Sequence, residues 1–104
     1  MALNSFGLSA NILQSICSAI GNFPEVERAQ LFGSRARGNF KPESDIDIAV
    51  IAPTMSAARF AMLWSALDEL PLVFKLDLLH FEALSNDALR NKILRDGIQI
   101  HPQK

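Results

Sequence analysis

The sequence has almost no cysteine, no long apolar run and no excess of either charge. Cys17 is the only cysteine of the 104 residues, which excludes an internal disulfide and a cysteine-based zinc cluster. It lies beside Ile16 and before Ile20, a helical pattern typical of a small core residue. No apolar stretch approaches the roughly 18 residues that cross a bilayer, and no basic residue precedes Arg28. The sequence therefore lacks a signal peptide's charged start, and we expect a cytoplasmic protein with no membrane contact.

The charge balance also argues against a protein that binds nucleic acid over a general basic surface. The formal net charge is −1, so we expect no general nucleic-acid surface, and any such role would need a local basic patch. Hydrophobic residues make up 49% and charged residues 20% of the chain, as in ordinary globular domains. A chain of this length buries roughly two thirds of its unfolded surface. Residues 1–104 are therefore expected to form a single domain.

The hydrophobic periodicity predicts helices and strands in alternation. Ser9, Ser85 and either Thr54 or Ser56 are candidate N-caps for three helices, and Trp64 with most of the phenylalanines is expected in the core. The order of elements predicts an α/β (α+β) fold, a small mixed β-sheet packed with helices. The predicted elements are a helix over 9–21, strands over 26–32 and 45–51, a helix over 56–70, a strand over 72–81, a helix over 86–96 and a short edge strand over 98–100.

Two aspartates open the clearest strand. Alternation places Asp45 and Asp47 on one face of the strand over 45–51, with Ile46 and Ile48 on the other. Their Cα atoms would lie about 6.6 Å apart, and carboxylates that approached to about 5 Å would repel by about 3 kcal/mol at an effective dielectric near 20. A domain with a total stability of about 5–15 kcal/mol needs compensation for such a pair. Basic neighbours, full exposure or a divalent cation would each supply it.

A third aspartate favours the cation. Asp77 lies in the middle of the apolar run FKLDLLHF, although aspartate is depleted in strands and usually has a specific partner when it is buried. If the strand over 72–81 pairs beside the strand over 45–51, three carboxylates converge. Oxygen donors without His or Cys favour Mg²⁺, and two such ions are the usual means of in-line nucleotidyl transfer. His80 and His101 have no partner spacing and are expected to be structural or solvated.

A glycine-serine pair supplies a candidate phosphate cradle. Gly33 lets the backbone turn tightly and approach a ligand, and Ser34 starts a segment, SRARG, that we predict as one helical turn facing an anion. Arg35 and Arg37 are candidates for contacts with phosphate oxygens. Each element alone is commonly a turn or solvated surface, and Asp-x-Asp pairs also occur in sugar transferases and aspartyl phosphatases. Together they predict a nucleotide site.

Gly33-Ser34, ten intervening residues and Asp45-x-Asp47 together resemble the signature of the DNA polymerase β-like nucleotidyltransferase superfamily. Within it, GSRARG, SDIDIAV and KLDLLHF are similar to the minimal nucleotidyltransferases, including MntA-type antitoxins. The resemblance implies that Asp45 and Asp47 bind Mg²⁺ and a nucleoside triphosphate such as ATP. By the same resemblance, Asp77 helps to bind metal and activates the attacking hydroxyl, while Gly33 and Ser34 hold the terminal phosphates.

The resemblance also implies a partner. Minimal nucleotidyltransferases are often encoded beside a HEPN-domain RNase toxin, which they bind and adenylylate. Larger members carry an additional helical domain, so here we expect a partner to complete the site. An apolar partner surface is expected on the helix over 56–70, at Ala57, Ala58, Ala61 and Met62, unless its own domain or a homodimer buries that helix. The expected function is transfer of AMP from ATP to a hydroxyl. The alternatives are an antitoxin that acts by contact alone and an enzyme that adenylylates a small molecule such as an aminoglycoside.

Overall fold

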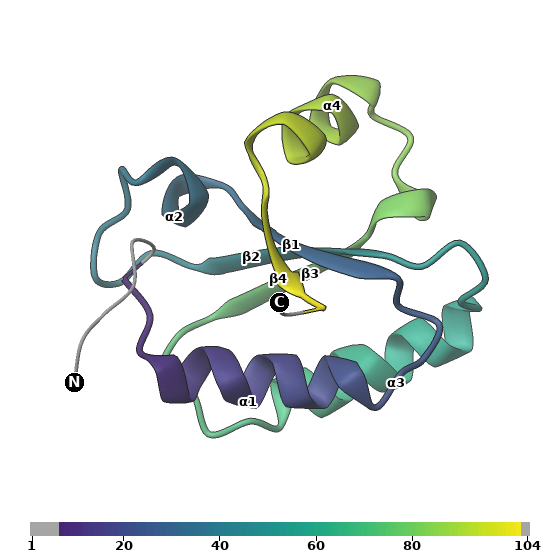
Figure 1. Ribbon diagram of the computed structural model, residues 1–104, viewed down its shortest axis with the longest axis horizontal. Coiled ribbons are helices and arrows are strands. Elements are labelled where there is room, and N and C mark those ends of the chain that lie inside the picture. Colours follow the sequence, from purple (N-terminus) through teal and green to yellow (C-terminus); the bar gives the residue numbers. More distant parts are fainter. Residues whose placement is uncertain (1–6, 103–104) are drawn as a thin grey trace.

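The fold is a four-stranded mixed sheet with helices on both faces (Figure 1). The computed structural model describes residues 7–102, and within them the strand order is β3-β2-β1-β4. Strand β1 is antiparallel to β2 and to β4, whereas β2 and β3 are parallel. The predicted α/β (α+β) class is confirmed. In chain order the elements are α1 (Ala10–Gly21), β1 (Arg28–Phe32), α2 (Ser34–Arg37), β2 (Ile46–Ile51), α3 (Ala57–Asp68), β3 (Leu76–His80), the 3₁₀ helix η1 (Phe81–Ala83), α4 (Asp87–Asp96) and β4 (Ile98–His101).

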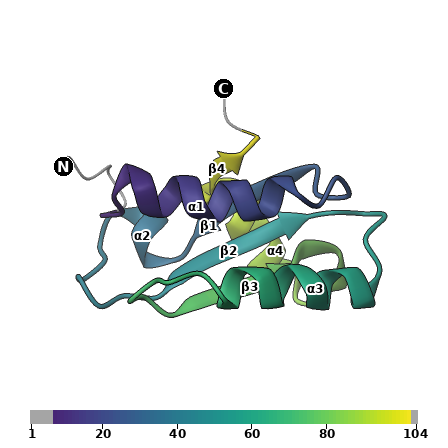
Figure 2. The same ribbon diagram turned by 90° about the horizontal axis from the view of Figure 1, so that it is seen from below.

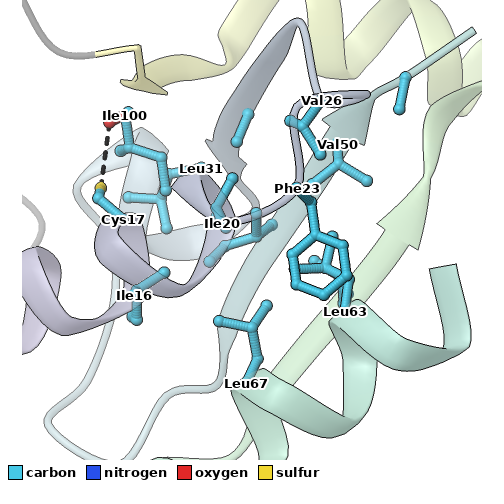
Figure 3. Close-up of a cluster of buried hydrophobic side chains, with 14 of the residues drawn as sticks. Ile16, Cys17, Ile20, Phe23, Val26, Leu31, Val50, Leu63, Leu67 and Ile100 are labelled. Carbon is cyan, nitrogen blue, oxygen red and sulfur yellow. Dashed lines mark hydrogen bonds between the residues drawn. The ribbon is translucent and has the colours of Figure 1, made fainter. Parts of the chain in front are cut away.

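One face of the sheet, which we call the closed face, is covered by α1 and α3 (Figure 2). Alternate residues of the strands point into it, including Leu31 of β1 and Val50 of β2. Cys17 belongs to this core, as predicted, and its thiol donates a hydrogen bond to the Ile100 carbonyl oxygen at 3.1 Å (Figure 3). The labelled side chains of Figure 3 that fill this core also include Ile16, Ile20, Phe23, Val26, Leu63 and Leu67.

In the described part of the chain, the other face, which we call the open face, carries α2, η1 and α4 (Figure 1). A small apolar cluster joins Ala49 and Ile51 of β2 to Phe81 of η1 and Ile93 of α4. This cluster covers the second half of β2. The open-face side of the first half of β2, which begins at Ile46, lies outside this cluster.

Helices α1, α3 and α4 begin at polar caps, two of which the sequence predicted. The Ser9 hydroxyl accepts from the Ile12 amide at 3.2 Å, and the choice between Thr54 and Ser56 falls on Ser56, which caps α3. Asn86 caps α4 by accepting from the Leu89 amide at 3.0 Å. The predicted cap at Ser85 was wrong by one residue, because α4 begins at Asp87 and Asn86, an N-cap as favourable as serine, directly precedes it.

Strand β3 is shorter than predicted at both ends. Its first paired residue, Leu76, lies opposite Ile46, where β2 begins, so the preceding residues 72–75 have no strand to pair with. After His80 the chain turns into η1. His80 has the expected structural role, since its Nε2 lies 2.9 Å from the Ala52 carbonyl oxygen and its ring stacks on Phe60. Among residues 7–102, no helix has the length and apolar character that crossing a membrane requires.

Candidate active site

Two aspartates meet on the open face, at the start of two parallel strands. Asp47 of β2 and Asp77 of β3 are direct neighbours in the register, on strands that lie about 4.8 Å apart. The next residues on the same face, Ala49 and Leu79, lie in or against the apolar cluster under α4, which fixes the face that the acids share. Asp45 precedes β2 and is exposed. The structure therefore pairs Asp47 most directly with Asp77, and Asp45 flanks them.

Asp47 carries a negative charge that the protein compensates only in part. Burial raises the pKa of this half-buried carboxyl group, and the charges of Asp77 and Asp45 raise it further. Arg35 and Arg37 act in the opposite direction, but the net pKa shift is upward. The ionised carboxylate is thus disfavoured, and a bound cation would stabilise it.

The carboxylates suit a magnesium ion that arrives with a nucleotide. No group of three or more His, Cys, Asp or Glu side chains in the described part of the chain is arranged to hold a metal ion by itself. Mg²⁺ is commonly bound through one or two carboxylates, and water and substrate phosphates complete its octahedron. Asp47 and Asp77 supply that number of hard oxygen donors. Their chemistry and spacing therefore fit Mg²⁺ shared with phosphates better than a permanently caged metal.

The turn after β1 packs directly on Asp47. Phe32, the last residue of β1, lies opposite Asp47 in the antiparallel register, and Gly33 follows with φ 78° and ψ −155°. This backbone conformation is essentially restricted to glycine, and a Cβ at position 33 would collide with the Asp47 carboxylate. The sequence predicted that Gly33 allows a close backbone approach, and the structure shows an approach to Asp47 itself. The glycine-serine turn and the acids thus form one continuous site.

Residues 34–37 form the predicted short turn of helix, α2. Ser34 is half-buried at its start and Arg37 is exposed at its end. The chain then reverses at Gly38, whose φ is 84°. The Arg37 guanidinium is therefore accessible to a phosphate group from solvent. Its charge acts to lower the pKa of Asp47.

Arg35 occupies a different place from the one predicted. Its side chain is 1% exposed, its Nε and Nη2 donate to the Ser44 carbonyl oxygen at 3.2 and 2.9 Å, and Nη2 donates to the Pro42 carbonyl oxygen at 3.2 Å. The guanidinium also packs on the rings of Phe40 and Phe74, 5.1 and 4.9 Å from their centroids. Burial lowers the pKa of Arg35, against the opposing charge of Asp47. The prediction of a phosphate contact from Arg35 is corrected, since its donors are directed at carbonyl oxygens inside the protein.

These contacts give Arg35 a structural role that the sequence did not reveal. Phe40, Pro42 and Ser44 lie in the loop before β2, and Phe74 lies just before β3. One buried guanidinium therefore joins α2 to the starts of both acid-bearing strands. Phe40 and Phe74, on which the Arg35 guanidinium packs, are visible in the sequence. Their positions in the chain do not indicate that they lie next to Arg35.

Known proteins share this fold and family. Residues 14–104 match the family model described as "Polymerase beta, Nucleotidyltransferase". A structure of a toxin–antitoxin with AMP-PNP is 27% identical with a TM-score of 0.63, over 93% of this chain and 76% of that one. The MntA–HepT toxin–antitoxin is 27% identical with a TM-score of 0.60, over 91% and 74%.

A third structure contains an MNT antitoxin in complex with a tri-AMPylated HEPN toxin of Shewanella oneidensis. It is 25% identical with a TM-score of 0.58, over 89% of this chain and 71% of that one. No curated protein matches the sequence. Since the family model spans most of the chain, the chain belongs to the polymerase β-like nucleotidyltransferase family, and its similarity to toxin–antitoxin structures is consistent with an MNT-type antitoxin.

Proposed function

We propose that the protein is a magnesium-dependent nucleotidyltransferase that moves a nucleoside monophosphate, in the first place AMP from ATP, to a hydroxyl group on a HEPN-type partner and thereby acts as its antitoxin. The observation that supports this most directly is the register that pairs Asp47 with Asp77. The turn at Gly33, packed on the Asp47 carboxylate, adds a place for phosphates beside the acids.

Each residue then has a part in the transfer. Asp45 and Asp47, with help from Asp77, would hold magnesium and the triphosphate, while Gly33 and Ser34 would hold its terminal phosphates. Asp77 accepts the proton of the acceptor hydroxyl, whose oxygen attacks the α-phosphorus as the bond to pyrophosphate breaks. Magnesium, with two ions expected, supplies charge neutralisation on the triphosphate when it is bound.

Arg37 is the arginine that we assign to the phosphates. It is exposed next to the glycine-serine turn, whereas Arg35 is enclosed by the loops before β2 and β3. An arginine fork can bind phosphate oxygens in a bidentate manner. In this proposal Arg37 strengthens binding of the leaving pyrophosphate portion and has no part in proton transfer.

Two observations support a protein partner. The three similar structures named above are toxin–antitoxin structures, and one of them contains an AMPylated HEPN toxin. The helix face named from the sequence is exposed in this chain at Ala57, Ala58 and Ala61, and Met62 is 55% exposed. The chain's own fold therefore leaves that apolar face available for a partner.

The test is a transfer assay with ATP labelled on its α-phosphate. Purified protein and Mg²⁺ are incubated alone and with the HEPN-domain product of the neighbouring gene, and label on protein is measured. Wild type should label the partner, and Asp47→Asn should not. Glu43→Gln is the matched control, because Glu43 is an exposed carboxylate in the loop just before β2 and is not one of the motif acids. It should transfer label as wild type does.

A binding-only antitoxin is the rival outcome of the same experiment. If wild type and Asp47→Asn protect the partner's RNA substrate from cleavage equally well and neither transfers label, neutralisation occurs by contact and the enzymatic proposal fails. Label on an aminoglycoside in place of the partner would contradict the choice of acceptor.

A further inference from the structure

Within residues 7–102, strand β3 is an outer strand of the sheet. In that range it pairs with β2 and with no other strand, so one of its sides is without a paired strand. The Lys75 carbonyl oxygen accepts from the Ile46 amide at 2.9 Å, so alternation along the strand directs the backbone groups of Leu76 and Leu78 away from β2. Among residues 7–102, these outward N–H and C=O groups have no backbone partner. Such a row is a template for an additional strand.

An apolar groove runs along this free edge. It has a volume of about 410 Å³ and is lined by Phe60, Ala61 and Trp64 of α3 and by Asp77 and Leu78 of β3. The α3 side of the edge is therefore apolar, whereas the carboxylate of Asp77 lies on the open face. A peptide paired with this edge would thus meet apolar side chains on one face and a carboxylate on the other.

We propose that the acceptor protein presents its hydroxyl on an extended segment that pairs with the free edge of β3. This inference rests on the proposed function. A residue directly opposite Asp77 would have its side chain on the same face, with Cβ atoms about 4.5–5.5 Å apart, which brings a hydroxyl within reach of the carboxylate. Its two neighbours would point to the other face, towards Phe60 and Trp64. The acceptor segment therefore has the pattern apolar, hydroxyl, apolar.

The size of the edge favours a transient peptide over a second copy of the chain. Strand β3 has five residues, a length of about 17 Å. A stable protein–protein interface uses about 20–30 residues on each side. Main-chain hydrogen bonds with one or two side-chain pockets are the usual basis of recognition by strand addition, and they suit a substrate that must leave after modification.

The opposite edge of the sheet does not share these features. Strand β4 has four residues, and the register of its pairing with β1 shifts between Ala29 and Gln30. Such irregularities discourage pairing at an edge. Strand β4, Ile98–His101, also carries no acidic residue. Only the β3 edge combines regular backbone groups with a candidate catalytic carboxylate.

Peptide binding at this edge can be measured without any transfer. Trp64 is the only tryptophan of the chain and lines the groove, so its fluorescence reports occupancy. The probes are synthetic peptides of about 15 residues that tile the HEPN-domain neighbour. Binding peptides should contain the apolar-hydroxyl-apolar pattern, and Ala61→Phe should weaken them at least tenfold by filling the groove. Ala88→Phe is the matched control, because Ala88 is an exposed alanine on α4 that neither lines the groove nor belongs to the partner-facing side of α3.

A second pair of variants tests the backbone contacts. Leu76→Pro removes an outward N–H that β2 does not use, a change that outer strands tolerate, whereas Leu76→Ala loses the side chain but keeps the amide. Peptide binding should fall at least tenfold further in Leu76→Pro than in Leu76→Ala, with magnesium-ATP affinity equal in both. Equal peptide affinities in wild type, Ala61→Phe and Leu76→Pro would overturn the inference. Absence of label transfer by wild type to any acceptor would instead refute the proposed function. The fluorescence titration would still show whether peptides bind at the β3 edge.

Discussion

The two faces of the sheet are built from the same strands but serve different ends. On the closed face, β2 contributes Ile46, Ile48 and Val50, all fully buried under α1 and α3. On the open face the same strand contributes Ala49 and Ile51 to a small apolar cluster, and it leaves Asp47 half-buried beside Asp77. The alternation of side chains along β2 thus places the residues of the main core on one face and the candidate catalytic aspartate on the other.

The difference lies in how far each face is covered. Two helices extend along the closed face (Figure 2). On the open face, the apolar cluster with η1 and α4 involves only Ala49 and Ile51, in the second half of β2. The uncovered half is where the glycine-serine turn and the acids meet. Changes on the closed face should therefore alter the free energy of unfolding alone, and changes at the uncovered end should alter activity out of proportion to stability.

The largest effect is expected at Asp47. Asp47→Asn should lower transfer by about 10³-fold or more, because a metal ion that stabilises developing charge contributes several kcal/mol. Stability should not fall, since the substitution removes a carboxylate whose ionised form the fold disfavours. Transfer assays and urea unfolding of the same samples measure both. A loss of activity that only follows a loss of stability would contradict the separation of the faces.

The raised pKa of Asp47 leads to a prediction about how stability depends on pH. Because the pKa of Asp47 is raised in the folded state, the folded protein binds that proton more tightly than the unfolded chain. The free energy of unfolding should therefore fall as the pH rises from the usual aspartate pKa through the raised value, and it should level off above it. Asp47→Asn should lack this fall, so the variant gains on wild type at neutral pH. Denaturant titrations across that window check the sign.

Asp77→Asn should reduce transfer by about 10²–10⁴-fold, the usual contribution of a positioned base. In contrast to Asp47→Asn, it should keep measurable affinity for magnesium-ATP, because its main part is to take the acceptor's proton. Isothermal titration calorimetry with a non-hydrolysable ATP analogue separates binding from transfer. If binding is lost as completely as in Asp47→Asn, Asp77 is chiefly a metal ligand.

Arg35 and Arg37 allow a test on two identical side chains. Arg35→Met should lower the free energy of unfolding by about 3 kcal/mol, since it removes the three hydrogen bonds that the guanidinium donates to the Ser44 and Pro42 carbonyl oxygens, each worth about 1 kcal/mol. Arg37→Met should change stability by no more than about 0.5 kcal/mol, as exposed substitutions do, but it should raise the KM for ATP. Thermal unfolding and steady-state kinetics on both variants give the comparison. A stable Arg35→Met protein with weakened ATP binding would restore the phosphate role originally expected for Arg35.

The comparison of faces also shows what the sequence could predict. The sequence left open whether the strand with Asp77 pairs beside β2, and the structure shows that it does. The alternation of β2, in contrast, is local, so the opposition of Asp47 to Ile46 and Ile48 followed from spacing alone. Local caps such as Ser9 were predictable for the same reason. These features depend on residues that are close in the chain.

Features that depend on distant loops were not predictable. The position of Arg35 requires the loops that contain Phe40 and Phe74 to meet, and the sequence pattern instead favoured a phosphate contact. The start of β3 was predicted too early, because it is set by where β2 begins and not by the apolar residues that precede Leu76. The pairing of β4 with β1 likewise depends on the whole sheet.

The smallest expected effect is a glycine substitution on the closed-face side of the molecule. Gly21 ends α1, its φ is not positive, and a Cβ there would have nothing within 4 Å. Gly21→Ala should therefore raise the free energy of unfolding by about 0.5–1 kcal/mol, through the lower entropy of the unfolded chain, and leave transfer unchanged. Gly33→Ala is the matched control. The same added methyl should cost about 1–3 kcal/mol there, from φ 78° and the strain of that conformation, and it should also displace the Asp47 carboxylate and reduce transfer. Unfolding curves and transfer rates for both variants check the pair. Equal behaviour of the two alanines would mean that the turn at Gly33 adapts freely, and the site would then lack the fixed contact between the glycine-serine turn and Asp47.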